Sequence, residues 1–231
     1  MREVTPAEDI AALFELAKQF WLTGAISTAV STFIGAYFAF QFERNARRID
    51  LIETEVASGN RALFTLLLIW NKQKQYQKEV VDIYRNREDA WLNLAAGGSI
   101  GDSSLLFDLK ELSFVLQKKG SIFQFAVLEA DRFHSVSNHI DQRNKLVLFE
   151  VFPRMSAAGL EINQFANVEL IRTILTAGVV RQLEVLTRGI INNIDENVAS
   201  SRDVFRKFRA ALKEIYPDKK FIDFVEEKEL R

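Results

Sequence analysis

The sequence predicts an all-α protein in which a single N-terminal transmembrane helix is followed by an elongated antiparallel helical bundle with two helices of about 50 residues. Three observations favour this fold class. Residues 20–42 contain no charged side chain, and residues 43–94 contain no proline and only one glycine. Residues 167–216 carry an apolar stripe at helical spacing, and no part of the chain shows the alternation that is typical of a strand.

Composition restricts the class of function. The 30 lysines and arginines balance the 31 aspartates and glutamates, which gives a net charge of −1 and no overall basic surface for nucleic acid. The chain has no cysteine, so disulfides, thiolate metal sites and a cysteine nucleophile are excluded. This composition also suits a domain that faces a reducing compartment.

Residues 1–18 are predicted to form an amphipathic tail. Thr5 is suited to be a helix N-cap, Pro6 to be the first helical residue and Glu8 to complete a capping box. The tail is acidic overall, so it lacks the basic region of a cleaved signal peptide.

Residues 19–42 are predicted to be the transmembrane helix. At 1.5 Å per residue, residues 20–42 extend about 35 Å, enough to cross a hydrocarbon core about 30 Å thick. The alternatives are a core helix of a soluble bundle and an amphipathic surface helix. An uncharged run of this length is unusual in a core helix of a soluble bundle. An amphipathic surface helix would have a charged face, which this run lacks.

The residues that flank the span predict its orientation. Arg44, Arg47 and Arg48 follow it directly, whereas the tail before it is acidic. The positive-inside rule then places the N-terminus outside and the bundle, residues 43–231, in the cytoplasm. The basic residues near the end of the last helix could also contact anionic lipid beside this flank, although we favour the interpretation that they form an ordinary solvated helix face.

Small residues recur along the span at a spacing of about one helical turn. Such residues let helix backbones approach closely, and hydroxyl groups can hydrogen-bond across the contact. This pattern predicts self-association, although serine and threonine can instead bond to carbonyls of their own helix. The residues predicted to form the contact are Gly24, Ser27, Thr28, Ser31, Thr32 and Gly35.

The bundle is predicted to contain four helices. The first, residues 43–94, has a seven-residue repeat in which Leu63 and Leu66 occupy a and d positions. After a loop at 95–104, a short helix at 105–118 has Leu105, Leu109, Leu112 and Leu116 on one stripe and ends at Gly120. A third helix, residues 121–151, stops before Pro153, and the last covers 167–216. Short loops would make helices that follow one another antiparallel.

No catalytic motif is visible, so the sequence predicts no enzyme, no cofactor and no metal site. The two histidines, His134 and His139, are five residues apart and point about 140° apart on a helix, so they cannot hold one metal together. Polar residues on two predicted helices could instead face each other and bind a small signalling ligand, or could simply be solvated. The residues predicted to form this pocket are Arg132, His139, Arg143 and Asn193.

These observations favour a membrane-tethered interaction or scaffold protein that self-associates through its span. The alternative is a signal-gated effector, in which the bundle senses a ligand or partner and the assembled spans permeabilise the membrane; a membrane-bound enzyme is a third possibility. The expected partners are membrane lipid, further copies of the chain, and a protein or small signalling ligand, but not nucleic acid. Ion leakage under some trigger would distinguish the effector from the scaffold.

Overall fold

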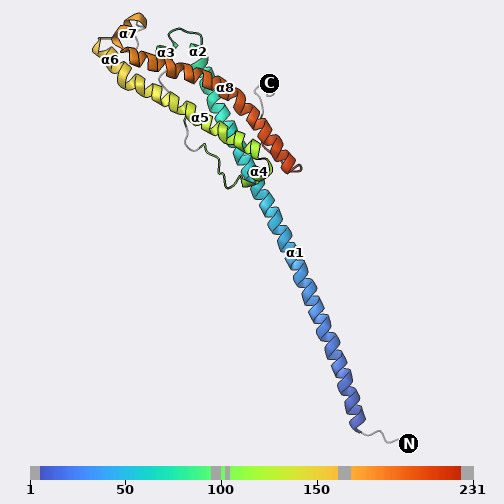
Figure 1. The fold of residues 1–231 in the computed structure, drawn as a ribbon. Coiled ribbons are helices and arrows are strands. Elements are labelled where there is room, and N and C mark those ends of the chain that lie inside the picture. The colour runs from blue at the N-terminus through green and yellow to red at the C-terminus, as the bar shows by residue number, and fades with distance from the viewer. Residues whose placement is uncertain (1–5, 95–99, 102–104, 161–167, 225–231) are drawn as a thin grey trace. The chain divides into compact units, whose positions relative to one another are not determined.

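The computed structural model describes residues 6–94, 100–101, 105–160 and 168–224, and in these residues the protein is all-helical, without a strand. The chain divides into two compact units, residues 1–54 and residues 55–231. The helices, shown in Figure 1, are α1 (Pro6–Tyr76), α2 (Asp82–Tyr84), α3 (Ala90–Asn93), α4 (Ser113–Lys118), α5 (Gly120–Leu146), α6 (Phe152–Ala157), α7 (Val168–Ile174) and α8 (Ala177–Ile215). Two π-helical turns, Gln77–Val81 and Val147–Val151, follow α1 and α5 directly.

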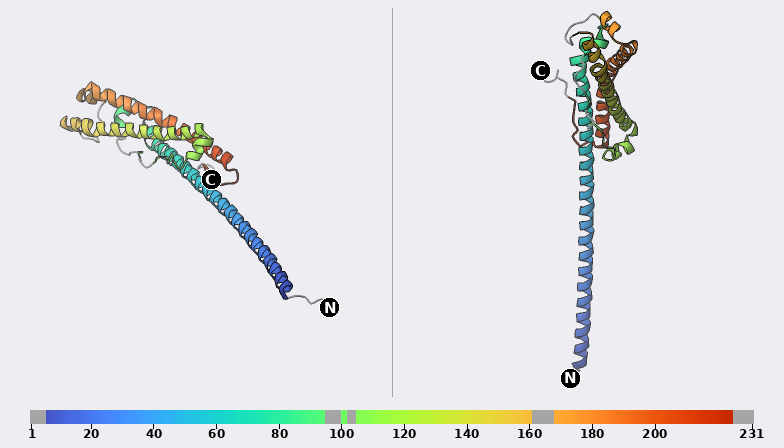
Figure 2. Two further views of the ribbon diagram at one scale, coloured as in Figure 1. Left: turned by 60° about the horizontal axis from the view of Figure 1, so that its bottom comes forward. Right: turned by 90° about the vertical axis from the view of Figure 1, so that its left-hand side faces the viewer.

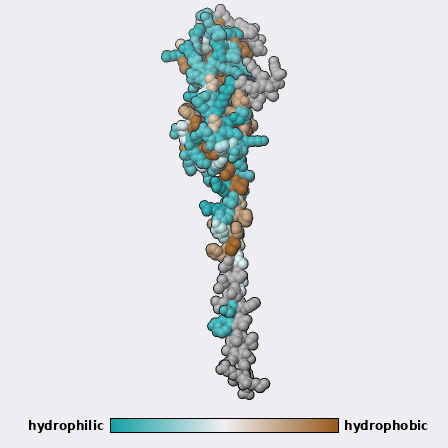
Figure 3. All heavy atoms as spheres, turned by 90° about the vertical axis from the view of Figure 1, so that its right-hand side faces the viewer, coloured by the Kyte–Doolittle hydropathy of each residue, from teal (hydrophilic) through white to brown (hydrophobic). Residues whose placement is uncertain are grey.

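In the first unit the described chain is helical throughout, as part of α1. The helix begins at Pro6, as the capping pattern predicts, although Thr5 itself lies outside the described residues. Every side chain from 31 to 40 is exposed. Figure 3 shows hydrophobic side chains on the surface of α1. Between residues 31 and 42, the large exposed hydrophobic side chains are Phe33, Ile34, Tyr37, Phe38, Phe40 and Phe42.

Within the part of the chain that the structure describes, no helix combines the length and the apolar character needed to cross a membrane. Part of the predicted span falls outside that part, because the side chains of residues 20–23, 25–27, 29 and 30 are not described.

The second unit is built on three helices: residues 55–76 of α1, α5 and α8. Helices α5 and α8 are antiparallel, since Arg143 bonds to Thr187 at one end and Glu129 bonds to Ser200 towards the other. Helix α8 is also antiparallel to this part of α1, because Glu55 contacts Tyr216 and Gln77 contacts Asp195. It follows that α1 and α5 run parallel to each other, and Figure 2 shows α5 and α8 side by side in both views.

The parallel pair corrects the prediction that successive long helices are antiparallel. Two neighbouring helices can be parallel only if the chain between them returns along the length of the bundle. Here residues 85–119 form this returning connection, and they contain only the short helices α3 and α4. Residues 105–112 form no helix, so the helix predicted over 105–118 is confirmed only as α4. Leu105 and Leu112 are buried, but Leu109 and Leu116 are exposed, because without a helix the four leucines do not share a face.

Two predicted helix ends and one predicted C-cap are also wrong. The first long helix does not continue to residue 94, since turns separate α2 from α3. Pro153 does not end a helix; it lies in the first turn of α6, where a missing N–H is tolerated. Helix α4 does end at Lys118, as predicted, but Gly120 is not its C-cap. Gly120 begins α5 and lacks the left-handed conformation of a C-cap glycine, which among the described glycines is found at Gly159 alone (φ 76°).

The last predicted helix is divided into α7 and α8. Thr176 is extended (φ −70°, ψ 148°), and its hydroxyl accepts a hydrogen bond from the Val179 N–H at 3.4 Å as the N-cap of α8. The apolar stripe is nevertheless confirmed: its members in α8 are buried or half-buried. With Leu63 and Leu66 of α1 they form the core of this unit.

Candidate functional site

The predicted contact face of the span is partly described. The Thr28 hydroxyl donates to the Gly24 carbonyl and the Thr32 hydroxyl to the Thr28 carbonyl, each at 2.8 Å. These two hydroxyls are therefore satisfied within their own helix. A Cβ added at Gly24 or Gly35 would meet no atom within 4 Å, so both positions are open to a close partner. Ser31 is exposed, and the side chain of Ser27 is not described, so self-association stays a prediction.

The basic residues that follow the span, Arg44, Arg47 and Arg48, are all exposed. Arg47 forms an ion pair with Glu43 at 2.5 Å. Among the described residues, no ion pair of Arg44 or Arg48 is found. Near the end of α8, three cations have carboxylate partners within the second unit. The pairs are Lys207–Asp203, Arg209–Asp223 and Lys119–Glu214. Such exposed pairs neutralise charge and contribute little stability, which favours a solvated face there.

No described hydrogen bond joins any two of the four residues of the predicted ligand pocket, and this pocket stays a prediction. Arg132 is exposed and pairs with Glu129. His139 is half-buried with an unpartnered Nδ1, and Asn193 is half-buried on α8. Arg143 alone lies in the interior, with 1% of its surface exposed.

Arg143 is a buried cation whose hydrogen-bond partners are neutral. Its Nε donates to Thr187 Oγ1 at 2.9 Å, and its Nη2 donates to the Trp91 carbonyl at 3.1 Å. Burial lowers the pKa of Arg143 to about 10, so the guanidinium is still charged at neutral pH, and burial raises the pKa of nearby Tyr76 to about 12. The side chain thereby ties α5 to α8 and to α3.

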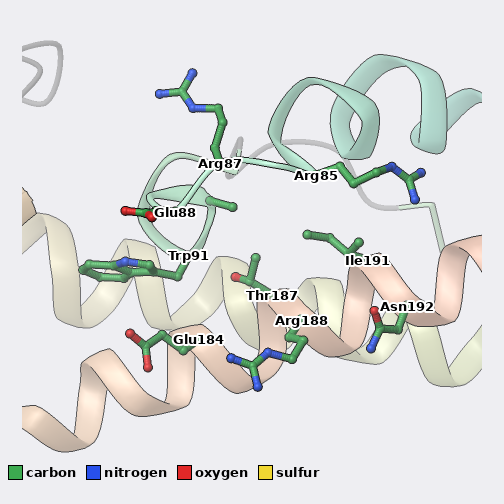
Figure 4. A pocket seen from close by; sticks show the side chains of 10 residues that line it. Arg85, Arg87, Glu88, Trp91, Glu184, Thr187, Arg188, Ile191 and Asn192 are labelled. Carbon is green, nitrogen blue, oxygen red and sulfur yellow. The ribbon is translucent and has the colours of Figure 1, made fainter.

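Two partners of Arg143 also line a groove of about 270 Å³ between residues 85–91 and α8, shown in Figure 4. Thr187 and Trp91 are 3% and 4% exposed, and the indole Nε1 of Trp91 has no hydrogen-bond partner. In Figure 4, Thr187 extends from α8 towards the segment that carries Glu88 and Trp91. The remaining lining residues are Arg85, Arg87, Glu88, Ala90, Glu184, Arg188, Ile191 and Asn192.

An ion-pair network fixes one end of this groove. Arg85 donates to both oxygens of Asp195 on α8, and its Nη2 also reaches Asp82 at 2.7 Å. Gln77 adds a bond to Asp195 at 2.7 Å. The hydrogen bond from Arg85 is the main reason that the pKa of Asp195 falls below its ordinary value. Asp195 therefore fastens the end of α1 and the following turns to α8.

A second polar cluster lies between α5 and α8. Glu129 is 1% exposed, accepts from the Ser200 hydroxyl at 2.9 Å and pairs with Arg132 at 2.8 Å. Burial raises the pKa of Glu129, while the bonds from Ser200 and Arg132 act in the opposite direction. Further along α5, Asn197 of α8 reaches the Arg132 carbonyl at 3.5 Å. Polar residues of the two predicted helices thus meet here in helix–helix contacts.

Sequence reasoning identified Arg143 but missed Trp91, Thr187 and Arg85. Trp91 occupies an a position of the seven-residue repeat, so its pattern indicated only burial. Among the described residues, no group of histidine, aspartate and glutamate side chains could hold a metal ion. No protein-family model, no curated protein and no solved structure matches this chain.

Proposed function

We propose that the protein is a membrane-tethered scaffold that self-associates through the helix at residues 19–42. The observation that carries this proposal is the uncharged run 20–42 within α1, together with the exposure of every side chain from 31 to 40. The tail at 1–18 precedes this anchor, and the bundle at 43–231 is the part available to a protein partner.

The distribution of apolar side chains around the helix supports a lipid environment. At 100° per residue, Phe33, Ile34 and Phe38 lie at about 0°, 100° and 140°, and Phe42 and Phe40 at about 180° and 340°. All five are at least 48% exposed. The remaining arc of the helix holds small uncharged residues such as Gly35, Ala36 and Ala39. A helix that is apolar on all sides is stable where lipid or protein surrounds it. A bilayer covers every side at once, whereas a single protein partner covers one.

The proposed orientation places the N-terminus outside and the bundle in the cytoplasm, since Arg44, Arg47 and Arg48 follow the run and an acidic tail precedes it. Because the chain has no cysteine, a single Ser156→Cys variant gives one thiol at an exposed position of α6. We expect a membrane-impermeant maleimide to label it only after the cells are broken. Labelling of intact cells would contradict the orientation.

Self-association is expected to depend on Gly24 and Gly35, which are eleven residues apart and fall on the same side of the helix. In the double variant Gly24→Leu, Gly35→Leu, bulky side chains would keep two backbones apart, so the cross-linked oligomer in membranes should decrease at least severalfold. A matched control is Phe33→Leu with Phe40→Leu, two leucines on the opposite side of the helix. The proposal fails if both double variants cross-link like the parent chain.

A further inference from the structure

We propose that the groove between residues 85–91 and α8 binds a small phosphorylated metabolite, a phosphate monoester of a sugar or nucleoside. The site is distinct from the anchor and from the self-association on which the proposed function rests. It lies wholly within the second unit of the chain.

The first step is the uncompensated charge of Arg143. A buried cation without a counter-ion is strongly unfavourable. Here the guanidinium bonds to the Thr187 hydroxyl and to the Trp91 carbonyl, and no carboxylate among the described residues pairs with it. Both partners line the groove, so the positive charge lies directly behind its wall. An anion in the groove would supply the missing counter-charge.

The second step is the donors that the wall presents. The Trp91 indole N–H is buried without an acceptor, and a buried donor without a partner destabilises the folded protein. Thr187 Oγ1 accepts from Arg143, so its own proton remains available, and no acceptor for it is found among the described residues. An N–H and an O–H next to a buried cation match a ligand group with several acceptor oxygens, as a phosphate has.

The third step is the charged side chains at the edge. Arg188, one residue after Thr187 on α8, has no ion pair with any described residue and is exposed. Glu184 is neutralised by Arg172 at 2.8 Å. Glu88, exposed and likewise without a described partner, can accept hydrogen bonds from hydroxyl groups. Phosphate near Arg188 and hydroxyls near Glu88 together describe a phosphorylated sugar or nucleoside.

Size restricts the ligand further. A volume of about 270 Å³ lies just below the range of roughly 300–1,000 Å³ that is typical of sites for drug-sized molecules. A single sugar or nucleoside with one phosphate group is therefore the expected size. The Arg172 guanidinium lies over one face of the Trp91 ring, 5.2 Å from the ring centre, so a ligand cannot stack on that face.

The test uses the full chain in a non-ionic detergent, labelled with ¹⁵N at its three tryptophans. The probes are ribose 5-phosphate, adenosine 5′-monophosphate, inorganic phosphate, ribose and succinate. We expect the two phosphate monoesters to shift the indole signal of Trp91 while those of Trp21 and Trp70 stay in place. Inorganic phosphate should shift the same signal at higher concentration, and ribose and succinate should not.

Variants then separate the groove from general charge effects. We expect Arg188→Gln to weaken binding of the phosphate monoesters at least tenfold, because a charge-assisted hydrogen bond is lost. Arg181→Gln is the matched control: it removes an exposed arginine two turns earlier on α8 that does not line the groove, and it should leave binding unchanged.

Three results would overturn the assignment: no shift of Trp91 with any phosphate probe at about 10 mM, an equal loss of binding in both arginine variants, or binding of succinate in preference to the phosphates. Because this site lies outside the span, loss of oligomers in the leucine variants would leave the binding result intact, and the two proposals can fail separately.

Discussion

Phe208→Ala is expected to lower the free energy of unfolding of the second unit by about 3–5 kcal/mol, the largest effect that we predict for a single substitution. Phe208 is fully buried on α8, in the cluster that contains Leu63 of α1 and Phe123 of α5. Removing its ring takes away apolar contacts with both of those helices and leaves a cavity that packed helices cannot close completely. For a domain of this size the loss corresponds to a decrease in Tm of roughly 6–20 °C.

Thermal unfolding of the full chain in a non-ionic detergent, followed by tryptophan fluorescence, measures this effect, since Trp70 and Trp91 both lie in the second unit. The matched control is Phe149→Ala, the same change at a side chain that is 73% exposed, for which we expect less than about 0.5 kcal/mol. Equal effects of the two substitutions would show that Phe208 does not lie in a packed core.

The sequence could predict which faces of the long helices are suited to burial. Leu63 and Leu66 follow the seven-residue repeat of α1, and both are fully buried. Ile49 belongs to the same repeat and is 55% exposed, in the first unit. Periodicity therefore identified an apolar face, but it did not indicate which element, if any, covers it. The partner of a face is set by contacts between distant segments, which local spacing does not encode.

The positions where helices break were the least predictable part of the fold. Residues 85–89 contain neither glycine nor proline, yet the helix ends there, where Arg87 bonds to Asp89 at 2.8 and 2.7 Å. Conversely, Pro153 breaks nothing, because it falls in the first turn of a new helix after a π-helical turn. The first helix end thus comes without a residue of low helix propensity, and the proline lies where its missing N–H is tolerated. The connection that begins at the first helix end returns along the bundle, which makes α1 and α5 parallel.

The candidate groove was predictable only through Arg143. A polar run on an amphipathic helix indicated that residue, but its partners, Trp91 and Thr187, are 52 and 44 residues away along the chain. Each of those two is typical of a helix core when considered alone. The orphaned indole N–H and the missing counter-ion are properties of three segments brought together, so no motif in one segment could have revealed them.

Gly59→Leu is expected to destabilise the second unit by about 1–3 kcal/mol, because it overfills the contact between α1 and α8. A Cβ added at Gly59 would lie 3.0 Å from both methyl carbons of Leu212 and 3.4 Å from a ring carbon of Phe221. Gly59→Ala should be nearly neutral, since the gain of about 1 kcal/mol in helix propensity is offset by crowding against the flexible end of Leu212. The larger leucine side chain has no such space and must displace α8.

Gly189 on α8 is the matched control for this contact, because a Cβ added there would meet no atom within 4 Å. Gly189→Leu should raise stability by roughly 0.5–1 kcal/mol through helix propensity alone. The measurement is thermal unfolding of four variants, with alanine and leucine at each of the two glycines. We expect leucine to lower the free energy of unfolding at position 59 and to raise it at position 189. If both leucines stabilise the protein, α8 does not pack against α1 at Gly59, and the antiparallel pairing inferred from Glu55–Tyr216 and Gln77–Asp195 would have to be abandoned.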